Sequence, residues 1–87
     1  MKIKKGYVLR EVANQYIVVP TGNEALNFNG IITLNKTGKF LWELLQTPQT
    51  KETLVSSLLA HYNVTHDVAN VDVEEFINNL QKKNILE

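Results

Sequence analysis

The chain has 87 residues, of which 44% are hydrophobic and 21% are charged, as expected for one small globular domain over residues 1–87. It has no cysteine, which excludes a disulfide framework, a thiol nucleophile and a cysteine-based zinc site. Nine basic and nine acidic residues give zero net charge, so the chain lacks the overall basic character of nucleic-acid-binding domains. It shows neither a secretory signal nor an apolar run long enough to span a membrane, which predicts a cytoplasmic protein with no membrane partner.

The first part of the chain has the pattern of a small β-sheet. Short runs rich in β-branched and aromatic residues predict three strands, over 7–12, 16–20 and 31–34. The residues 13–15 between the first two runs are predicted to form a tight turn. Asn29-Gly30, just before the third run, favours the backbone of a two-residue hairpin loop, which predicts a second turn there.

The segment "ITLNKTGKFLWELL" changes from a strand pattern to a helix pattern at Asn35. Asn35 is a suitable N-cap, because its side-chain oxygen can accept from the free N–H groups of the first helical turn. Gly38 is interpreted as a point of close packing against the sheet. A Walker-type phosphate loop is excluded, because that motif requires glycine where Thr33 stands, and serine or threonine where Phe40 follows Lys39.

Three helices are predicted after this junction, so the order of elements indicates an α+β fold. The first helix has apolar residues over so wide an arc that it should lie centrally, with Trp42 buried. The second helix begins after Thr50, and its apolar stripe comprises Leu54, Val55, Leu58, Leu59 and Tyr62. The third follows a polar link over 65–67, and its apolar stripe comprises Val73, Phe76, Ile77 and Leu80. Asn84 is predicted to end it in a left-handed conformation.

Few side chains have the spacing of a catalytic or metal site. Asp72, Glu74 and Glu75 are interpreted as acids of the first turn of the third helix, where the helix dipole favours negative charge. His61 and His66 do not have the four-residue spacing of a two-histidine metal motif. The residues therefore predict a binding module without cofactor, metal or catalysis. Its most available binding element is the short third strand, because a strand at a sheet edge can pair with an extended peptide.

The stretch "NGIITLNKTG" over 29–38, with Leu41, Trp42 and Leu45 behind it, resembles the PqqD family, which comprises the pyrroloquinoline-quinone synthesis protein D and its relatives. Thr50 and the apolar residues of the third helix agree with this resemblance, which covers nearly the whole chain. One departure is Asn84, where the family usually has glycine. Asparagine also tolerates the left-handed backbone, so the expected fold is unchanged.

The resemblance implies a winged-helix-like fold and a role in recognising ribosomally made peptides that are later modified. In the family, the leader segment of the precursor peptide adds as a strand between the third strand and the third helix. It is thereby presented to a modifying enzyme, often a radical S-adenosylmethionine enzyme. We expect a monomer or a weak dimer. The peptide-binding residues predicted on this basis are Ile31, Ile32, Thr33, Leu34, Asp72, Glu75, Phe76 and Asn79.

The sequence leaves three questions open. The groove wall could instead be the other flank of the third helix, with Glu74, Ile77 and Gln81. The pathway could be quinone biosynthesis or the maturation of a different peptide. A winged-helix DNA-binding protein, or a regulatory protein without a peptide ligand, would share the architecture, although the acids of the third helix disfavour contact with nucleic acid.

Overall fold

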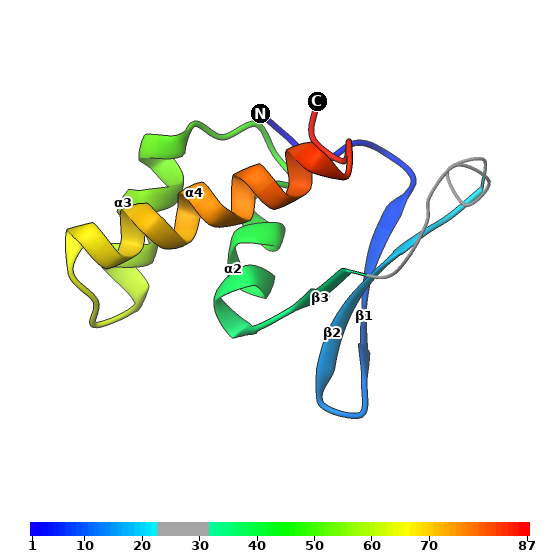
Figure 1. Cartoon of the computed structure of the whole chain (residues 1–87), viewed down its shortest axis with the longest axis horizontal. Coiled ribbons are helices and arrows are strands. Elements are labelled where there is room, and N and C mark those ends of the chain that lie inside the picture. Colours follow the sequence, from blue (N-terminus) through cyan, green and yellow to red (C-terminus); the bar gives the residue numbers. More distant parts are fainter. Residues whose placement is uncertain (23–31) are drawn as a thin grey trace.

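The computed structural model of the chain describes residues 1–22 and 32–87. In these residues three strands precede three helices: β1 (Tyr7–Val12), β2 (Gln15–Pro20), β3 (Ile32–Leu34), α2 (Lys36–Leu44), α3 (Lys51–His61) and α4 (His66–Lys82). The strands form an antiparallel sheet in the order β1-β2-β3, and the helices gather beside it (Figure 1). The predicted α+β order is confirmed. The turn predicted at Asn29-Gly30 falls outside the described residues.

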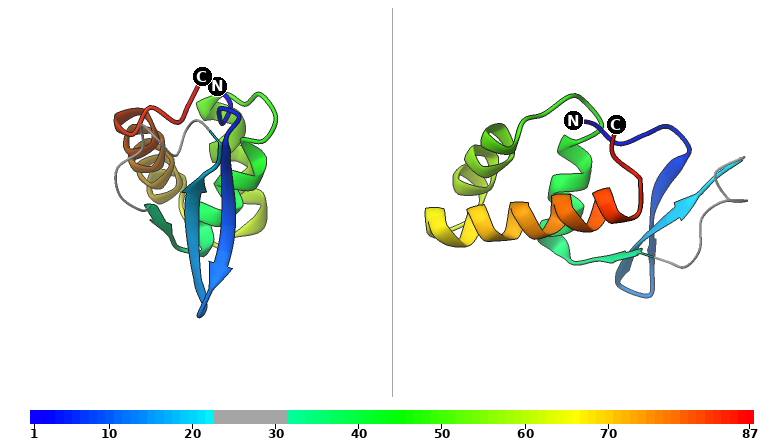
Figure 2. Two further views of the ribbon diagram at one scale, coloured as in Figure 1. Left: turned by 90° about the vertical axis from the view of Figure 1, so that its right-hand side faces the viewer. Right: turned by 45° about the horizontal axis from the view of Figure 1, so that its top comes forward.

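β1 and β2 form a hairpin with the two-residue loop Ala13-Asn14. Both loop residues have positive φ, 51° and 66°, which is the left-handed backbone that closes a tight hairpin. Gln15, assigned to the turn by its sequence, therefore pairs with Val12 as the first residue of β2. The hairpin extends away from the helices (Figures 1 and 2), and Val18 is the one residue of its two strands that is fully buried.

α2 begins as the sequence predicts. The Gly38 N–H donates to the Asn35 side-chain oxygen at 2.8 Å, so the N-cap is confirmed. Gly38 is buried where a Cβ atom would lie 3.1 Å from the Cβ of Leu34, which confirms the close approach to the sheet. Trp42 is 3% exposed, and Leu41 and Leu45 are buried beside it. The helix therefore lies at the centre of the core.

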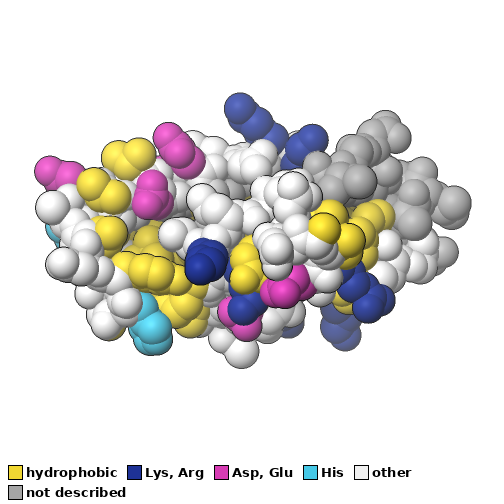
Figure 3. All heavy atoms as spheres, turned by 90° about the horizontal axis from the view of Figure 1, so that it is seen from below, with side chains coloured by type: hydrophobic (Ala, Val, Ile, Leu, Met, Phe, Trp, Pro, Cys, Tyr) yellow, Lys and Arg dark blue, Asp and Glu magenta, His cyan; other side chains and the backbone are white. Residues whose placement is uncertain are grey.

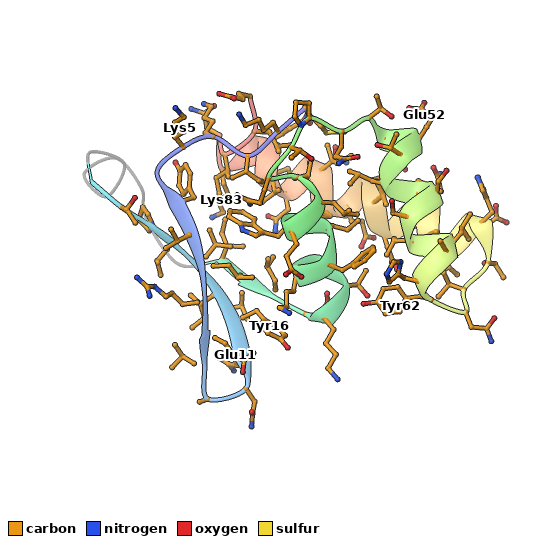
Figure 4. All side chains as sticks on the ribbon, turned by 180° about the vertical axis from the view of Figure 1, so that it is seen from behind. Lys5, Glu11, Tyr16, Glu52, Tyr62 and Lys83 are labelled. Atoms are coloured by element: carbon orange, nitrogen blue, oxygen red, sulfur yellow. The ribbon has the colours of Figure 1, made fainter. Side chains whose placement is uncertain are left out.

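α3 begins at a capping box in which Thr50 and Thr53 each accept from the other's backbone N–H. Its predicted stripe is only partly buried. Leu59 and Tyr62 are each 37% exposed, because α3 packs mainly on α4 and leaves its other side to solvent. Figure 3 shows hydrophobic side chains exposed at this end of the molecule. Tyr62, at the end of α3 (Figure 4), packs edge-on against Phe40 with 5.5 Å between ring centroids.

α4 begins at His66, earlier than the sequence pattern suggests. Thr65 is its N-cap and accepts from the Val68 N–H at 3.2 Å, so the predicted polar link is already the first turn of the helix. The predicted stripe of Val73, Phe76, Ile77 and Leu80 is buried. The earlier start has one important consequence: among the acids of this helix only Asp67 lies in the first turn.

The two termini close the helical core. Asn84 has φ of 59°, as predicted for a left-handed residue after a helix, and Ile85 is fully buried. Leu86 forms an antiparallel bridge with Ile3, and the Ile3 N–H donates to the Leu45 carbonyl at 2.9 Å. Within the described residues, none of the helices has the length and hydropathy needed to cross a bilayer.

Candidate functional site

A hollow of about 230 Å³ lies between the edge of β3, the first turns of α2 and one flank of α4. We call it the β3–α4 groove, and it is lined by Thr33, Leu34, Asn35, Thr37, Gly38, Leu41, Asp72, Glu75, Phe76 and Asn79. Six of the predicted peptide-binding residues are therefore brought together: Thr33, Leu34, Asp72, Glu75, Phe76 and Asn79.

The other two predicted residues have different positions. Ile32 belongs to β3, but its side chain is 4% exposed and belongs to the core, and it is not among the residues that line the groove. Ile31 lies outside the described residues. The alternative flank of α4 does not line the β3–α4 groove, and its Glu74 is paired with Lys51 at 2.6 Å. The geometry of the described residues therefore favours the flank of Asp72 and Asn79.

The direction of the backbone groups along β2 follows from its hairpin with β1. In an antiparallel ladder, opposite residues alternate between pairs that exchange two hydrogen bonds and pairs that exchange none. Val12 and Gln15 close a two-residue loop, so they form a hydrogen-bonded pair. Gln15 and every second residue after it therefore turn their N–H and C=O groups toward β1. The Thr21 N–H, at an even spacing from Gln15, donates to the Gly6 carbonyl at 2.7 Å, in agreement with this alternation.

The intervening residues of β2, Tyr16 and Val18, therefore turn their N–H and C=O groups toward β3. Tyr16 pairs with Leu34 and Val18 with Ile32, so these two β3 residues turn their N–H and C=O groups toward β2. Thr33 lies between them and turns its N–H and C=O to the open side, where no described strand pairs with β3. A single edge residue thus offers both a donor and an acceptor to an extended chain.

The opposite wall of the groove combines apolar and acidic groups. The apolar side chains of Phe76 and Leu41 line it but are only 9% and 1% exposed, whereas Asp72 is half-buried and Glu75 is exposed. No Lys, Arg or His is among the described residues that line the groove. The three ion pairs of the described residues involve Glu43, Glu74 and Glu87, so they leave both groove acids without a cationic partner.

The first turn of α2 supplies groove residues that sequence reasoning did not assign to the site. Asn35, Thr37 and Gly38 line its floor together with Leu41. Asn35 and Gly38 stood out in the sequence as a cap and a packing contact, and these roles place both residues beside the edge of β3. The sequence therefore marked both residues as important, but it indicated only their roles in the fold and not their position in the groove.

Comparison with known proteins identifies the family. The sequence matches the family described as coenzyme PQQ synthesis protein D (PqqD) over residues 8–86, which is nearly the whole chain. The chain belongs to the PqqD family. The family predicted from "NGIITLNKTG" and the following helix is thus confirmed. Comparison with curated proteins gave no match.

Two solved structures share the fold of this PqqD-family chain. One is described as TbiB1 in complex with the TbiA(beta) leader peptide, with a TM-score of 0.77 and 23% identity, covering 100% of this chain and 95% of that one. The other is a lasso peptide synthetase B1 complexed with the leader peptide, with a TM-score of 0.72 and 13% identity, covering 97% and 93% of the two chains. At these identities the likeness establishes a common fold.

Proposed function

We propose that this PqqD-family chain binds the leader segment of a ribosomally made precursor peptide as an added strand beside β3. The observation that carries the proposal is the open backbone of Thr33, which faces the β3–α4 groove. An extended peptide beside it gains main-chain hydrogen bonds from the edge and side-chain contacts from the groove, as in other cases of β-strand addition. The two similar structures are both complexes with leader peptides, which supports this use of the fold.

The groove suits a peptide better than a small molecule. It is open along the edge of a strand, and its polar and apolar groups come from three elements of the fold, β3, α2 and α4. Thr33 supplies pairing that does not depend on the peptide's sequence, whereas Phe76 supplies an apolar contact that depends on the peptide's side chains. Recognition therefore combines backbone pairing, which any peptide can make, with side-chain contacts that depend on the peptide's sequence.

The proposal assigns no chemical step to this chain. Binding the leader keeps the rest of the precursor available to a separate modifying enzyme, either in quinone synthesis or in the maturation of another peptide. A radical S-adenosylmethionine enzyme is the partner class expected from the family resemblance. The purified chain is expected to leave the precursor unchanged, which mass spectrometry of the peptide after incubation would show. Modification by the chain alone would contradict an adaptor role.

The direct test is an NMR titration of the isotope-labelled chain with the leader of a precursor gene found beside its own. Amide shifts centred on Thr33, Leu34 and the α4 residues from Asp72 to Asn79 are expected. A scrambled leader and a DNA duplex serve as controls. Shifts centred on Lys36, Lys39 and the hairpin loop, with duplex DNA as the tighter ligand and a steep dependence on salt, would overturn the proposal in favour of nucleic-acid binding.

A further inference from the structure

Within the described residues, Asp72 and Glu75 have no partner of opposite charge. The macrodipole of a helix acts within its first turn, and α4 begins at His66, so Asp72 and Glu75 lie beyond its reach. The sequence-based interpretation of these acids as first-turn residues is therefore wrong. Glu74, on the other flank, is neutralised by Lys51, but within the described residues neither groove acid forms an ion pair or a hydrogen bond. Their charge is available to a ligand.

β3 and α4 run in opposite directions along the groove (Figures 1 and 2). The earlier residues of α4 therefore lie toward the end of β3, and its later residues toward the start of β3. Asp72 and Glu75 belong to the end of the groove near Leu34, whereas Asn79 belongs to the end near Ile32. The groove is consequently acidic at one end and uncharged at the other.

Antiparallel pairing is slightly more stable per residue than parallel pairing, so we take the peptide to run antiparallel to β3. A single peptide residue opposite Thr33 then takes both of its hydrogen bonds. An antiparallel peptide places its earlier residue opposite Leu34 and its later residue opposite Ile32. Neighbouring residues of a strand point to opposite faces, so these two side chains share the buried face of Leu34 and Ile32 and enter the groove. The residue opposite Thr33 points away from it.

We infer that the leader presents the short motif basic–any–apolar to this groove, with its Lys or Arg against Asp72 and Glu75 and its apolar side chain toward Phe76. This inference rests on the leader-binding function proposed above and names the chemistry of the bound segment. The basic side chain supplies a positive charge, which none of the described lining residues carries. The apolar side chain, two positions later, covers the apolar surface beyond the acids.

The motif can be tested by selection from random peptides, which requires no knowledge of the natural leader sequence. A displayed library of short randomised peptides is enriched on the immobilised chain, and the selected peptides are sequenced. Enrichment of Lys or Arg two positions before an apolar residue is expected. Synthetic peptides that differ only in a central Lys-Thr-Leu, Glu-Thr-Leu or Leu-Thr-Lys segment then test the charge and the direction by titration. NMR shifts at the Thr33 amide show whether each peptide binds at the edge.

A matched pair of variants assigns the preference to the groove acids. Asp72→Asn/Glu75→Gln should lower the affinity for the Lys-Thr-Leu peptide by about two- to fivefold, the range of exposed ion pairs, and should raise that for Glu-Thr-Leu. The control Glu52→Gln/Glu74→Gln removes the same charge outside the groove and should leave both affinities unchanged. Circular dichroism verifies that both variants are folded.

The outcomes separate this inference from the proposed function. Peptides that shift Thr33 but show no preference for a basic residue would overturn the inference and leave leader binding intact. An equal loss of affinity in both double variants would also overturn it, because the effect would then be one of net charge. Selected peptides that leave Thr33 unshifted, or a library without binders, would count against strand addition itself and thus against both.

Discussion

The Cβ of Leu34 lies only 3.1 Å from the position that a Cβ on Gly38 would occupy, so the first turn of α2 touches the last residue of β3. Gly38→Ala sets two effects against each other. Alanine favours the helix by about 1 kcal/mol, but the added methyl overpacks a tight contact at a cost of about 1–3 kcal/mol. We expect a net loss of stability in urea denaturation and weaker peptide binding, because both residues line the groove.

A size series serves as the control for this prediction. Gly38→Val adds a branched side chain at the same position and should destabilise the chain more than Gly38→Ala. A stabilised alanine variant with unchanged peptide affinity would show that Leu34 moves aside freely, and the contact would then have no role in shaping the groove.

The Asn35 cap is expected to stabilise α2 measurably. Asn35→Ala removes the oxygen that accepts from the Gly38 N–H and should cost about 1 kcal/mol in chemical denaturation. Asn35→Ser keeps a capping oxygen and should remain close to the native stability. Equal stability of the alanine and serine variants would mean that the side-chain hydrogen bond contributes nothing in solution.

Trp42 is expected to dominate the stability of the helical core. It is 3% exposed, and Trp42→Ala should cost about 3–5 kcal/mol, a large fraction of the stability of so small a chain. Because it is the only tryptophan, its fluorescence maximum should be blue-shifted in the native state and move to longer wavelength on unfolding. A native maximum typical of water-exposed indole would contradict the buried position.

The fold was predictable where local signals and burial agree. Asn35 and Thr50 are caps, Asn84 is left-handed, and the stripe of α4 is buried, because each follows from the chemistry of one or a few neighbouring residues. The exposure of Leu59 and Tyr62 could not be read from their spacing. An apolar stripe shows which side of a helix can be buried, but the extent of burial depends on how many elements pack there.

The site was predictable as a set of residues, but its chemistry was not. Six residues named from the family resemblance do line one groove. The start of α4 at His66 was missed, because Thr65 and Asp67 suit a loop as well as an N-terminus. That error hid the fact that Asp72 and Glu75 lack an ion-pair partner in the part of the chain that the structure describes. The direction in which the Thr33 N–H and C=O point follows only from the registers of the β1–β2 and β2–β3 pairs, and a local sequence pattern does not contain these registers.

The backbone N–H of Thr33 is expected to donate to the bound peptide. Thr33→Pro removes an N–H that points away from β2, so the sheet keeps its ladder and the chain should remain folded. The proline ring also occupies the open edge. We therefore expect titration with the leader peptide to show at least about tenfold weaker binding, since a lost hydrogen bond and a steric block combine.

Two variants serve as controls for Thr33→Pro. Thr33→Val keeps the backbone N–H and should bind the peptide almost normally. Ile32→Pro removes a ladder donor and should instead destabilise the fold in urea. Retained affinity in a folded Thr33→Pro chain would show that the peptide does not pair with β3, and unfolding by Thr33→Pro but not by Ile32→Pro would reverse the assigned alternation.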